Sequence, residues 1–513
     1  MKRATFILPV LLIGMMLFGC TQLEQPASGE NISANESNTT VTTNVSAEML
    51  NVTITENISV ETSNATTTTN VSAGTTNITN TTNVSAGASN ATVTTIITPD
   101  NSCVNQPVDT GHMDIFDSHV HIPSTVSTSL MISEMDKAGV SVSNLYSDSS
   151  SALKAISEYP DRFITFVDTP DSPQPSTWLT QGQAFVASAE TQLKTGKYYG
   201  IGEANLRYSS GPTTPIVYVP ADTPLWLQLV DLSARYHVPI SFHFVPDDTA
   251  ANAAFERMLS HNKDAIPIWC HLGFNQLSLN STTLNDYLLR YPNLYFDTAG
   301  IQNMQNPLPQ INSNWARLSN QSNDGRLNED WKQFFETWNS RILFGSDAGG
   351  GSNGLERWLN YVNKTSDGAP PDAVGHWRHL FANLEYNAAR NIFNGNARAL
   401  LLKERKLPYN YSVTSDRNCY SISIISNSSV SALAFNQSAR ALTFTVADSI
   451  GTAGSAAITV PIALGGNFTA SVDGQSVQIK EASNSTHTTV SIEYAGGIRT
   501  VVISAATHAP PSG

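Results

Sequence analysis

Eight apolar, strand-like runs alternate with helical stretches between residues 109 and 408, and no other feature constrains the fold as strongly. The expected strands are Asp114–His121, Val142–Tyr146, Phe163–Asp168, Tyr199–Ala204, Pro239–Phe244, Ile266–His271, Leu294–Thr298 and Ile342–Asp347. Amphipathic periodicity predicts helices at Thr177–Lys194, Thr223–Tyr236, Ala250–Ser260, Ser281–Arg290 and Asp330–Ser340. Such repeats predict an α/β fold, a (β/α)8 TIM barrel. An open doubly wound sheet is the alternative, but no Gly-x-Gly-x-x-Gly turn follows the first strand.

Histidines and carboxylates end five of these strands. They are His119 and His121 on the first strand, Glu203 on the fourth, His243 on the fifth, His271 on the sixth and Asp347 on the eighth. Residues two apart in a strand share a face, so His119 and His121 point the same way. The carboxyl ends of barrel strands meet at one rim, where active sites form. Imidazole and carboxylate are zinc ligands, so we expect a divalent metal there, with zinc as the first choice and one or two ions.

These motifs resemble those of the amidohydrolase superfamily over roughly residues 112–403. The matching residues are Asp117-x-His119-x-His121, His243, His271 and Phe344-Gly345-Ser346-Asp347, and Asn391–Arg398 is similar to the closing helix of the amidohydrolase-related branch. The resemblance implies that His119, His121 and Asp347 bind one metal. It implies that His243 and His271 bind a second, or that His271 orients the water of a single metal. Glu203 takes the position of a bridging carboxylate, unless it is a rim carboxylate paired with Arg207.

The activity that this resemblance implies is that of a metal-dependent hydrolase acting on a small molecule with an amide, ester or related bond. Asp347 would be the general base, with His271 as the second catalytic residue. Arg207 and Tyr208 are candidates for holding a substrate carboxylate, although a solvated rim arginine is the simpler interpretation. Three alternatives stay open: a decarboxylase of the same fold, a non-catalytic surface binding protein, and a cell-surface structural role carried by the flanking segments.

The N-terminal residues 1–20 have the pattern of a lipoprotein-type signal peptide. Lys2 and Arg3 precede an apolar run that ends at Gly19-Cys20, and this run is short for a membrane span. We expect lipidation at Cys20 and an exported protein anchored on the outer face of the cell membrane. An uncleaved anchor helix is the alternative.

Residues 21–108 are rich in Thr, Asn, Ser, Val and Ala, with a unit that recurs at Thr42–Ala47, Thr68–Ala73 and Thr81–Ala86. Many asparagines open Asn-x-Ser/Thr sequons, among them Asn31, Asn44, Asn57, Asn70, Asn83 and Asn90. The apolar surface is too small to offset the entropy of ordering. The sequence therefore predicts a disordered, glycosylated linker, or the same linker without glycans.

Residues 415–513 alternate apolar and polar side chains with no helical period, and Asp473-Gly474 is a tight-turn signal. This pattern predicts a small all-β sandwich. It resembles the Ig-like modules of archaeal surface proteins, in which a Gly-Thr-x-Gly turn precedes an apolar strand ending in proline. Here that pattern is Gly451–Gly454 followed by Pro461.

Charge and cysteine content exclude two classes of protein. The formal net charge of −14 disfavours nucleic-acid binding. Four cysteines are too few for a disulfide scaffold. Cys103 and Cys419 flank the expected barrel and are candidates for a disulfide outside the cytoplasm, whereas Cys270 is expected to be a buried apolar residue. The sequence does not indicate an oligomeric state.

Overall fold

The computed structural model describes six strands within residues 31–98, and then residues 110–169, 175–208, 217–273, 280–300, 318, 325–350, 354–362, 373–416 and 418–505. The predicted signal peptide with Cys20 lies outside the described residues, as does Cys103. The chain divides into two units, Met1–Ser102 and Cys103–Gly513. Within the described residues, no helix is both long and apolar enough to cross a membrane.

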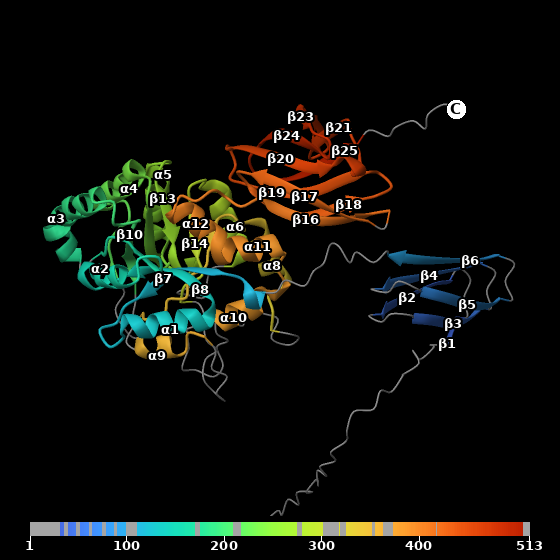
Figure 1. Ribbon diagram of the computed structural model, residues 1–513, viewed down its shortest axis with the longest axis horizontal. Helices are drawn as coiled ribbons and strands as arrows, with labels where there is room; N and C mark the ends of the chain where they lie inside the picture. The colour runs from blue at the N-terminus through green and yellow to red at the C-terminus, as the bar shows by residue number, and fades with distance from the viewer. Residues whose placement is uncertain are drawn as a thin grey trace, which may run out of the picture. The chain divides into compact units, whose positions relative to one another are not determined.

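The second unit begins with an α/β region, up to Leu401, that has the predicted alternation of strands and helices (Figure 1). Its strands are β7 (Ile115–His121), β8 (Val140–Tyr146), β9 (Phe163–Thr165), β10 (Ile201–Tyr208), β11 (Val217–Tyr218), β12 (Pro239–Phe244), β13 (Ile266–Trp269), β14 (Tyr295–Asp297) and β15 (Ile342–Leu343). Its helices are α1 (Thr128–Ala138), α2 (Ser149–Glu158), α3 (Pro175–Lys194), α4 (Pro224–Tyr236), α5 (Thr249–His261), α6 (Ser281–Arg290), α8 (Glu329–Thr337), α9 (Gly354–Leu359), α10 (Ala373–Leu380), α11 (Tyr386–Arg390) and α12 (Asn396–Leu401). Shorter turns are η1 (Thr110–His112), η2 (Cys270–Gly273), η4 (Phe381–Asn383) and η5 (Asn391–Gly395).

These strands form two sheets, β7-β8-β9 and β11-β10-β12-β13-β14-β15, in which every pair is parallel except β10 with the short β11. Two seams join the sheets. At one, Val167 pairs with Ile201, and at the other Val120 pairs with Ala348. The N–H of His121 donates to Ala348 O over 2.7 Å at the second seam. Because the eight principal strands run the same way, their carboxyl ends face one rim.

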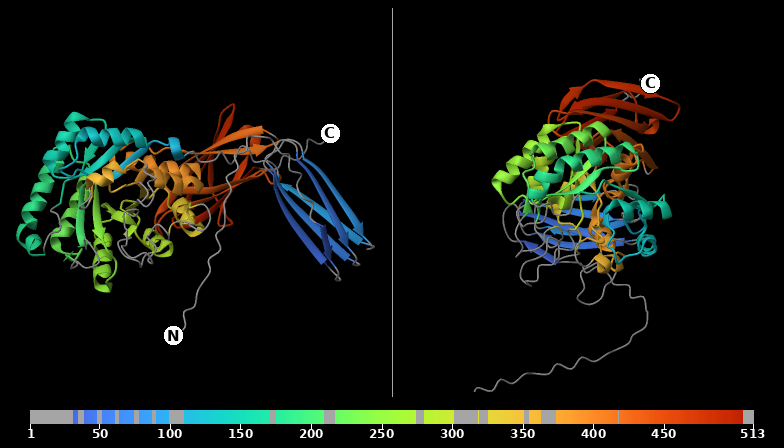
Figure 2. Two further views of the ribbon diagram at one scale, coloured as in Figure 1. Left: turned by 90° about the horizontal axis from the view of Figure 1, so that it is seen from below. Right: turned by 90° about the vertical axis from the view of Figure 1, so that its left-hand side faces the viewer.

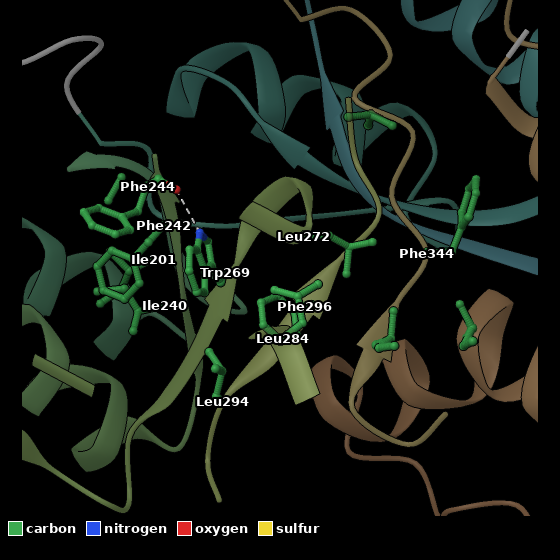
Figure 3. Packing of buried hydrophobic residues seen from close by; sticks show 14 of the residues in the cluster. Ile201, Ile240, Phe242, Phe244, Trp269, Leu272, Leu284, Leu294, Phe296 and Phe344 are labelled. Carbon is green, nitrogen blue, oxygen red and sulfur yellow. Dashed lines mark hydrogen bonds between the residues drawn. The ribbon is translucent and has the colours of Figure 1, made fainter. Parts of the chain in front are cut away.

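Helices flank the parallel sheets (Figure 2), and the apolar side chains that the alternation predicted pack between strands and helices (Figure 3). The side chains of Ile240, Phe242 and Trp269 are fully buried, and the Trp269 indole N–H donates to Phe244 O over 2.9 Å. Burying each such side chain stabilises the fold by roughly 1.5–3 kcal/mol. Trp269 is therefore a core residue and does not line the rim.

Side-chain caps explain where several helices begin. The Asn280 side chain accepts the N–H of Thr283 over 2.9 Å at the start of α6, and Asp248 accepts the N–H of Ala251 over 2.8 Å at the start of α5. The α4 helix ends at His237, whose φ of 51° is left-handed. Helix boundaries consequently agree with those predicted to within a few residues.

Four strands, β9, β13, β14 and β15, end earlier than predicted, and for β13 and β15 this moves predicted site residues off the strand. The sixth strand, β13, stops at Trp269, because His271 and Leu272 adopt left-handed backbone angles with φ of 63° and 48°. The eighth, β15, stops at Leu343, and Asp347 also has a positive φ of 60°. Both predicted site residues therefore lie on turns beyond the strands.

The described residues between Tyr409 and Ala505 form the predicted all-β sandwich, with two five-stranded antiparallel sheets (Figure 1). One sheet has the order β16 (Tyr409–Ser415), β17 (Asn418–Ser426), β20 (Ala453–Pro461), β24 (His487–Ala495) and β23 (Ile479–Ser483). The other has the order β18 (Ser429–Asn436), β19 (Ala441–Ala447), β25 (Ile498–Ala505), β21 (Phe468–Val472) and β22 (Gln475–Val477), and η6 (Ile462–Leu464) follows β20. The inward-facing residues make a separate apolar core.

A buried polar junction joins the sandwich to the α/β region. Asn339 is its centre, with an exposed fraction of 0%. The Asn339 amide donates to Val430 O over 3.1 Å, and its oxygen accepts the Tyr409 hydroxyl over 3.0 Å. The Ser340 and Ser429 hydroxyls lie 2.7 Å apart. The side chains of Asn339 and Ser340 therefore each have a partner in the sandwich.

The first unit has six strands within the segment for which the sequence predicts a glycosylated linker. These strands, β1 (Asn31–Ala34), β2 (Thr39–Ala47), β3 (Val52–Val60), β4 (Asn64–Ala73), β5 (Ile78–Ala86) and β6 (Asn90–Thr98), form the parallel sheets β1-β3-β5 and β2-β4-β6. Asn57 pairs with both Asn31 and Asn83, so like residues of the repeat stand in register.

Candidate metal centre

His119 and His121 at the end of β7 bring two ring nitrogens together. Their Nε2 atoms are 3.2 Å apart. His119 is completely buried, whereas the His121 side chain is 26% exposed. The Nδ1 of His119 lies 2.9 Å from Asp297 Oδ2. A proton shared with this carboxylate leaves the His119 Nε2 with a lone pair that faces the rim.

Glu203 lies at the centre of the group, at the end of β10. Its Oε2 is 3.3 Å from His119 Nε2 and 4.0 Å from His121 Nε2. Its Oε1 is 3.1 Å from His243 Nδ1 and 2.9 Å from His271 Nε2. One carboxylate therefore serves two histidine pairs with its two oxygens.

His243 and His271 form the second pair. His243 Nδ1 and His271 Nε2 are 3.0 Å apart. The other ring nitrogen of His271 lies 2.8 Å from Ala299 O. A carbonyl oxygen only accepts, so His271 Nδ1 carries a proton. Burial opposes the charged form of His271, but Glu203, which faces its Nε2, raises its pKa. Both pairs thus direct ring nitrogens toward the same carboxylate.

Asp347 lies beside the first histidine pair, His119 and His121. Its Oδ1 is 3.2 Å from His121 Nε2 and 3.9 Å from His119 Nε2. Arg357, on α9, donates from Nη1 to Asp347 Oδ2 over 2.7 Å and to Asp347 O over 2.9 Å. The guanidinium fixes the aspartate side chain with one oxygen left toward the histidines.

These atoms fit a divalent metal. Ligands at zinc bond lengths of 2.0–2.1 Å form a tetrahedron with edges of about 3.3–3.4 Å. Five distances among His119 Nε2, His121 Nε2, Glu203 Oε2 and Asp347 Oδ1 run from 3.2 to 4.0 Å. His119, His121 and Asp347 form one metal-compatible group, and His119, Glu203 and His271 form another. The donor set and its spacing suit a divalent metal ion.

The electrostatics of the group also favour a cation. Burial opposes the charged form of His119, but Glu203 and Asp297 raise its pKa well above the ordinary value. Burial likewise opposes ionisation of Glu203, yet His119 and His271 hold its pKa well below the usual range. The pKa of Asp347 is lowered in spite of burial, chiefly by Arg357. The carboxylates therefore remain ionised and attract positive charge.

Asp117 does not contact the histidine rings. Its carboxylate accepts the N–H groups of His119 and Ser346 over 3.2 and 3.0 Å and the Tyr361 hydroxyl over 2.6 Å. Burial raises the pKa of Asp117 to about 6. Asp117 therefore connects β7 to the turn that carries Asp347.

The other predicted residues are placed as follows. Arg207 is paired with Asp247, Nε to Oδ1 over 2.5 Å, and its guanidinium lies 5.4 Å from the centre of the Tyr218 ring. The alternative that the sequence left open, a pairing of Arg207 with Glu203, is not found among the contacts of the described residues. The side chain of Tyr208 lies outside the described residues. Cys270 is a buried free thiol, and Cys419 is disulfide-bonded.

Sequence analysis missed three residues of this site. Asp297 ends β14 and touches His119, Arg357 touches Asp347, and the Tyr146 ring centre lies 4.4 Å from that of His119. Tyr146 ends a predicted strand and Asp297 is the next-to-last residue of another, so their positions carried a usable signal. Arg357 lies on a helix after the last strand, where no strand register could indicate it.

No family model matches the chain, and no curated protein matches it. Solved structures similar to it include 2,6-dihydroxybenzoate decarboxylase from Rhizobium, at 14% identity and a TM-score of 0.33 over 57% of this chain and 98% of that chain. A probable 2-pyrone-4,6-dicarboxylic acid hydrolase from Acinetobacter baumannii, with citric acid bound, is 16% identical with a TM-score of 0.37, over 56% and 99%. An amidohydrolase 2 from Bifidobacterium longum subsp. infantis is 14% identical with a TM-score of 0.34, over 57% and 100%.

Proposed function

We propose that this protein is a metal-dependent hydrolase of the amidohydrolase superfamily that holds two divalent ions. The observation that carries the proposal is the division of Glu203, whose Oε2 faces His119 and whose Oε1 faces His243 and His271. A carboxylate shared between two ligand groups is the arrangement of two-metal hydrolytic sites. The hydrogen-bonded seams on either side of the two sheets support a closed (β/α)8 barrel around this site.

The chain offers ligands in two half-sites. His119, His121 and Asp347 would hold the first ion, and His243 and His271 the second, with Glu203 between them. Zinc suits the mixture of imidazole and carboxylate. When bound, the metal supplies a water acidified from a pKa of 15.7 to about 7 and polarises a substrate oxygen.

Asp347 is the proposed proton acceptor. The Arg357 ion pair keeps it ionised, so the carboxylate is ready to take a proton at neutral pH. The same ion pair lowers its proton affinity, which favours passing the proton on to a leaving group. In this two-ion arrangement His271 is a ligand, because its Nε2 is directed at Glu203 and its Nδ1 at Ala299 O.

The proposed cellular location and partners are those that the sequence predicts. We propose export, attachment to the outer face of the membrane through Cys20, and a small-molecule substrate that enters at the strand-end rim. Arg207 and Tyr208 stay candidates for the outer part of the substrate site, with Arg207 already paired to Asp247.

Metal analysis with a substrate screen tests the proposal. We expect about two zinc ions per chain, and Glu203→Gln should lose at least one of them. Glu190→Gln is a matched control, because Glu190 pairs with Lys194 and Arg235 on a helix away from the site. Hydrolysis in H₂¹⁸O should place ¹⁸O in the product. Release of CO₂ without ¹⁸O incorporation would identify a decarboxylase instead, and a chain that binds no metal would refute the enzyme.

A further inference from the structure

Asp297 is a buried carboxylate beneath the metal centre, with an exposed fraction of 1%. Its Oδ1 accepts the backbone N–H of His271 over 2.7 Å and that of Ala299 over 3.1 Å. Its Oδ2 lies 2.9 Å from His119 Nδ1. The Cys270 thiol is also hydrogen-bonded to it. The proposed function gives this residue no role.

The two carboxylate oxygens of Asp297 make different hydrogen bonds. Because Oδ1 already receives two backbone N–H groups, the carboxylate cannot rotate without losing both. Oδ2 is thereby aimed at His119 Nδ1, and an ionised carboxylate only accepts. In its neutral form, His119 must therefore carry its proton on Nδ1, which leaves Nε2 unprotonated toward His121 and Glu203.

The same carboxylate also supports the second half-site. The bond from the His271 N–H constrains a residue whose φ of 63° is left-handed and disfavoured for a side chain with a Cβ. With that backbone fixed, the His271 ring reaches both Ala299 O and Glu203. One side chain on β14 thus sets the ring of His119 and the backbone of His271.

We infer that Asp297 is a positioning residue that selects the metal-binding tautomer of His119 and joins the two half-sites through the backbone of His271. The part of this inference that concerns metal rests on the proposed function. The part that concerns the His119 tautomer does not. Residues behind metal-bound histidines commonly change metal affinity by 10–100-fold when they are mutated.

Asp297→Asn separates this role from a purely structural one. The asparagine keeps the size, and its oxygen must take the Oδ1 position to satisfy the two backbone N–H groups. Its NH₂ then faces His119 Nδ1, which has to become the acceptor. The proton moves to Nε2, where a metal would bind, so the variant should fold and yet bind metal poorly.

Nitrogen-15 NMR of the metal-free full chain, at a pH high enough for the His119 ring to be neutral, measures the tautomer directly. We expect the wild-type His119 to be protonated on Nδ1 and the Asp297→Asn variant on Nε2. Zinc titration should then show an affinity about 10–100-fold lower for Asp297→Asn. Asp231→Asn is the matched control, since Asp231 also faces a histidine ring, at 3.1 Å from His261 Nε2, away from the site. It should leave zinc affinity unchanged.

The outcomes are distinguishable. Protonation of wild-type His119 on Nε2, an unchanged tautomer in the variant, or equal zinc affinity in the two proteins would each overturn the inference. If Asp297→Asn fails to fold, the wild-type tautomer alone decides. A wild-type chain that binds no zinc would refute the proposed function, while the tautomer measurement would still judge the role of Asp297.

Discussion

The metal centre and the junction with the sandwich are both buried polar clusters, yet they are built in opposite ways. At the junction, Asn339 donates and accepts with partners from both regions, so its side-chain polar groups are paired. At the centre, histidine ring nitrogens face one another and carboxylate oxygens. Neighbouring acceptors need a proton or a metal ion between them, whereas a paired cluster needs neither. The comparison indicates that the centre can take up a cation, whereas Asn339 is satisfied without one.

The largest expected effect is on turnover. Asp347→Asn keeps the side-chain size and one ligand oxygen but cannot take a proton near neutral pH. General-base catalysis contributes 10²–10⁴-fold, so kcat should fall by about that factor. Metal content should fall less than in a His119→Ala, His121→Ala double variant. Near-normal kcat with the metal retained would sink the assignment of Asp347 as the base.

Removing metal should destabilise the centre and leave the junction intact. A ligand at 100–1,000 times its Kd stabilises the folded state by about 2.7–4.1 kcal/mol, and chelation should remove that amount. Chemical unfolding of the full chain with and without EDTA measures it. The comparison of the two clusters fails if the chelator has no effect on the free energy of unfolding.

Asn339→Ala should act in the reverse way. It leaves the buried Tyr409 hydroxyl and the Asn391 amide without their partner at Asn339, at a cost of about 1–3 kcal/mol each. Zinc affinity and kcat should stay at wild-type values. Loss of metal in this variant would show that the two clusters are coupled.

The smallest effect concerns pH at the junction. Glu385 accepts the Ala432 N–H over 2.7 Å, and burial together with nearby Glu336 raises its pKa from 4.5 to about 7. The folded state therefore holds a proton that the unfolded state releases above about pH 4.5. This stabilisation is complete below pH 4.5 and is lost as the pH rises through about 7. Glu385→Gln should flatten the dependence of unfolding free energy on pH over this range, and an unchanged slope would contradict it.

Much of the α/β region follows from the sequence because its strands are parallel. Parallel strands place their carboxyl ends on one rim, so the polar residues ending five predicted strands could be expected to meet. His119, Glu203 and Asp347 do meet. The chemistry expected of each residue could be predicted from the sequence, since residue type and strand position suffice for it.

What escaped prediction depends on details that strand patterns do not carry. Asp297 is the next-to-last residue of a predicted strand, but its link to His119 needs the separation of two strand ends in space. The left-handed turn at His271 is set by tertiary hydrogen bonds rather than by local residue type. The pairing of the N-terminal strands in register is a relation between repeats, and the composition of a segment carries no information about register.

Gly300 sets the minimum width of the centre. Its φ is 66°, and a Cβ there would lie 2.9 Å from both Asp347 Oδ2 and His271 Nδ1. A single added carbon would therefore push apart side chains that belong to different half-sites. The spacing on which two neighbouring ions would depend is thus controlled by a residue that has no side chain and performs no chemistry.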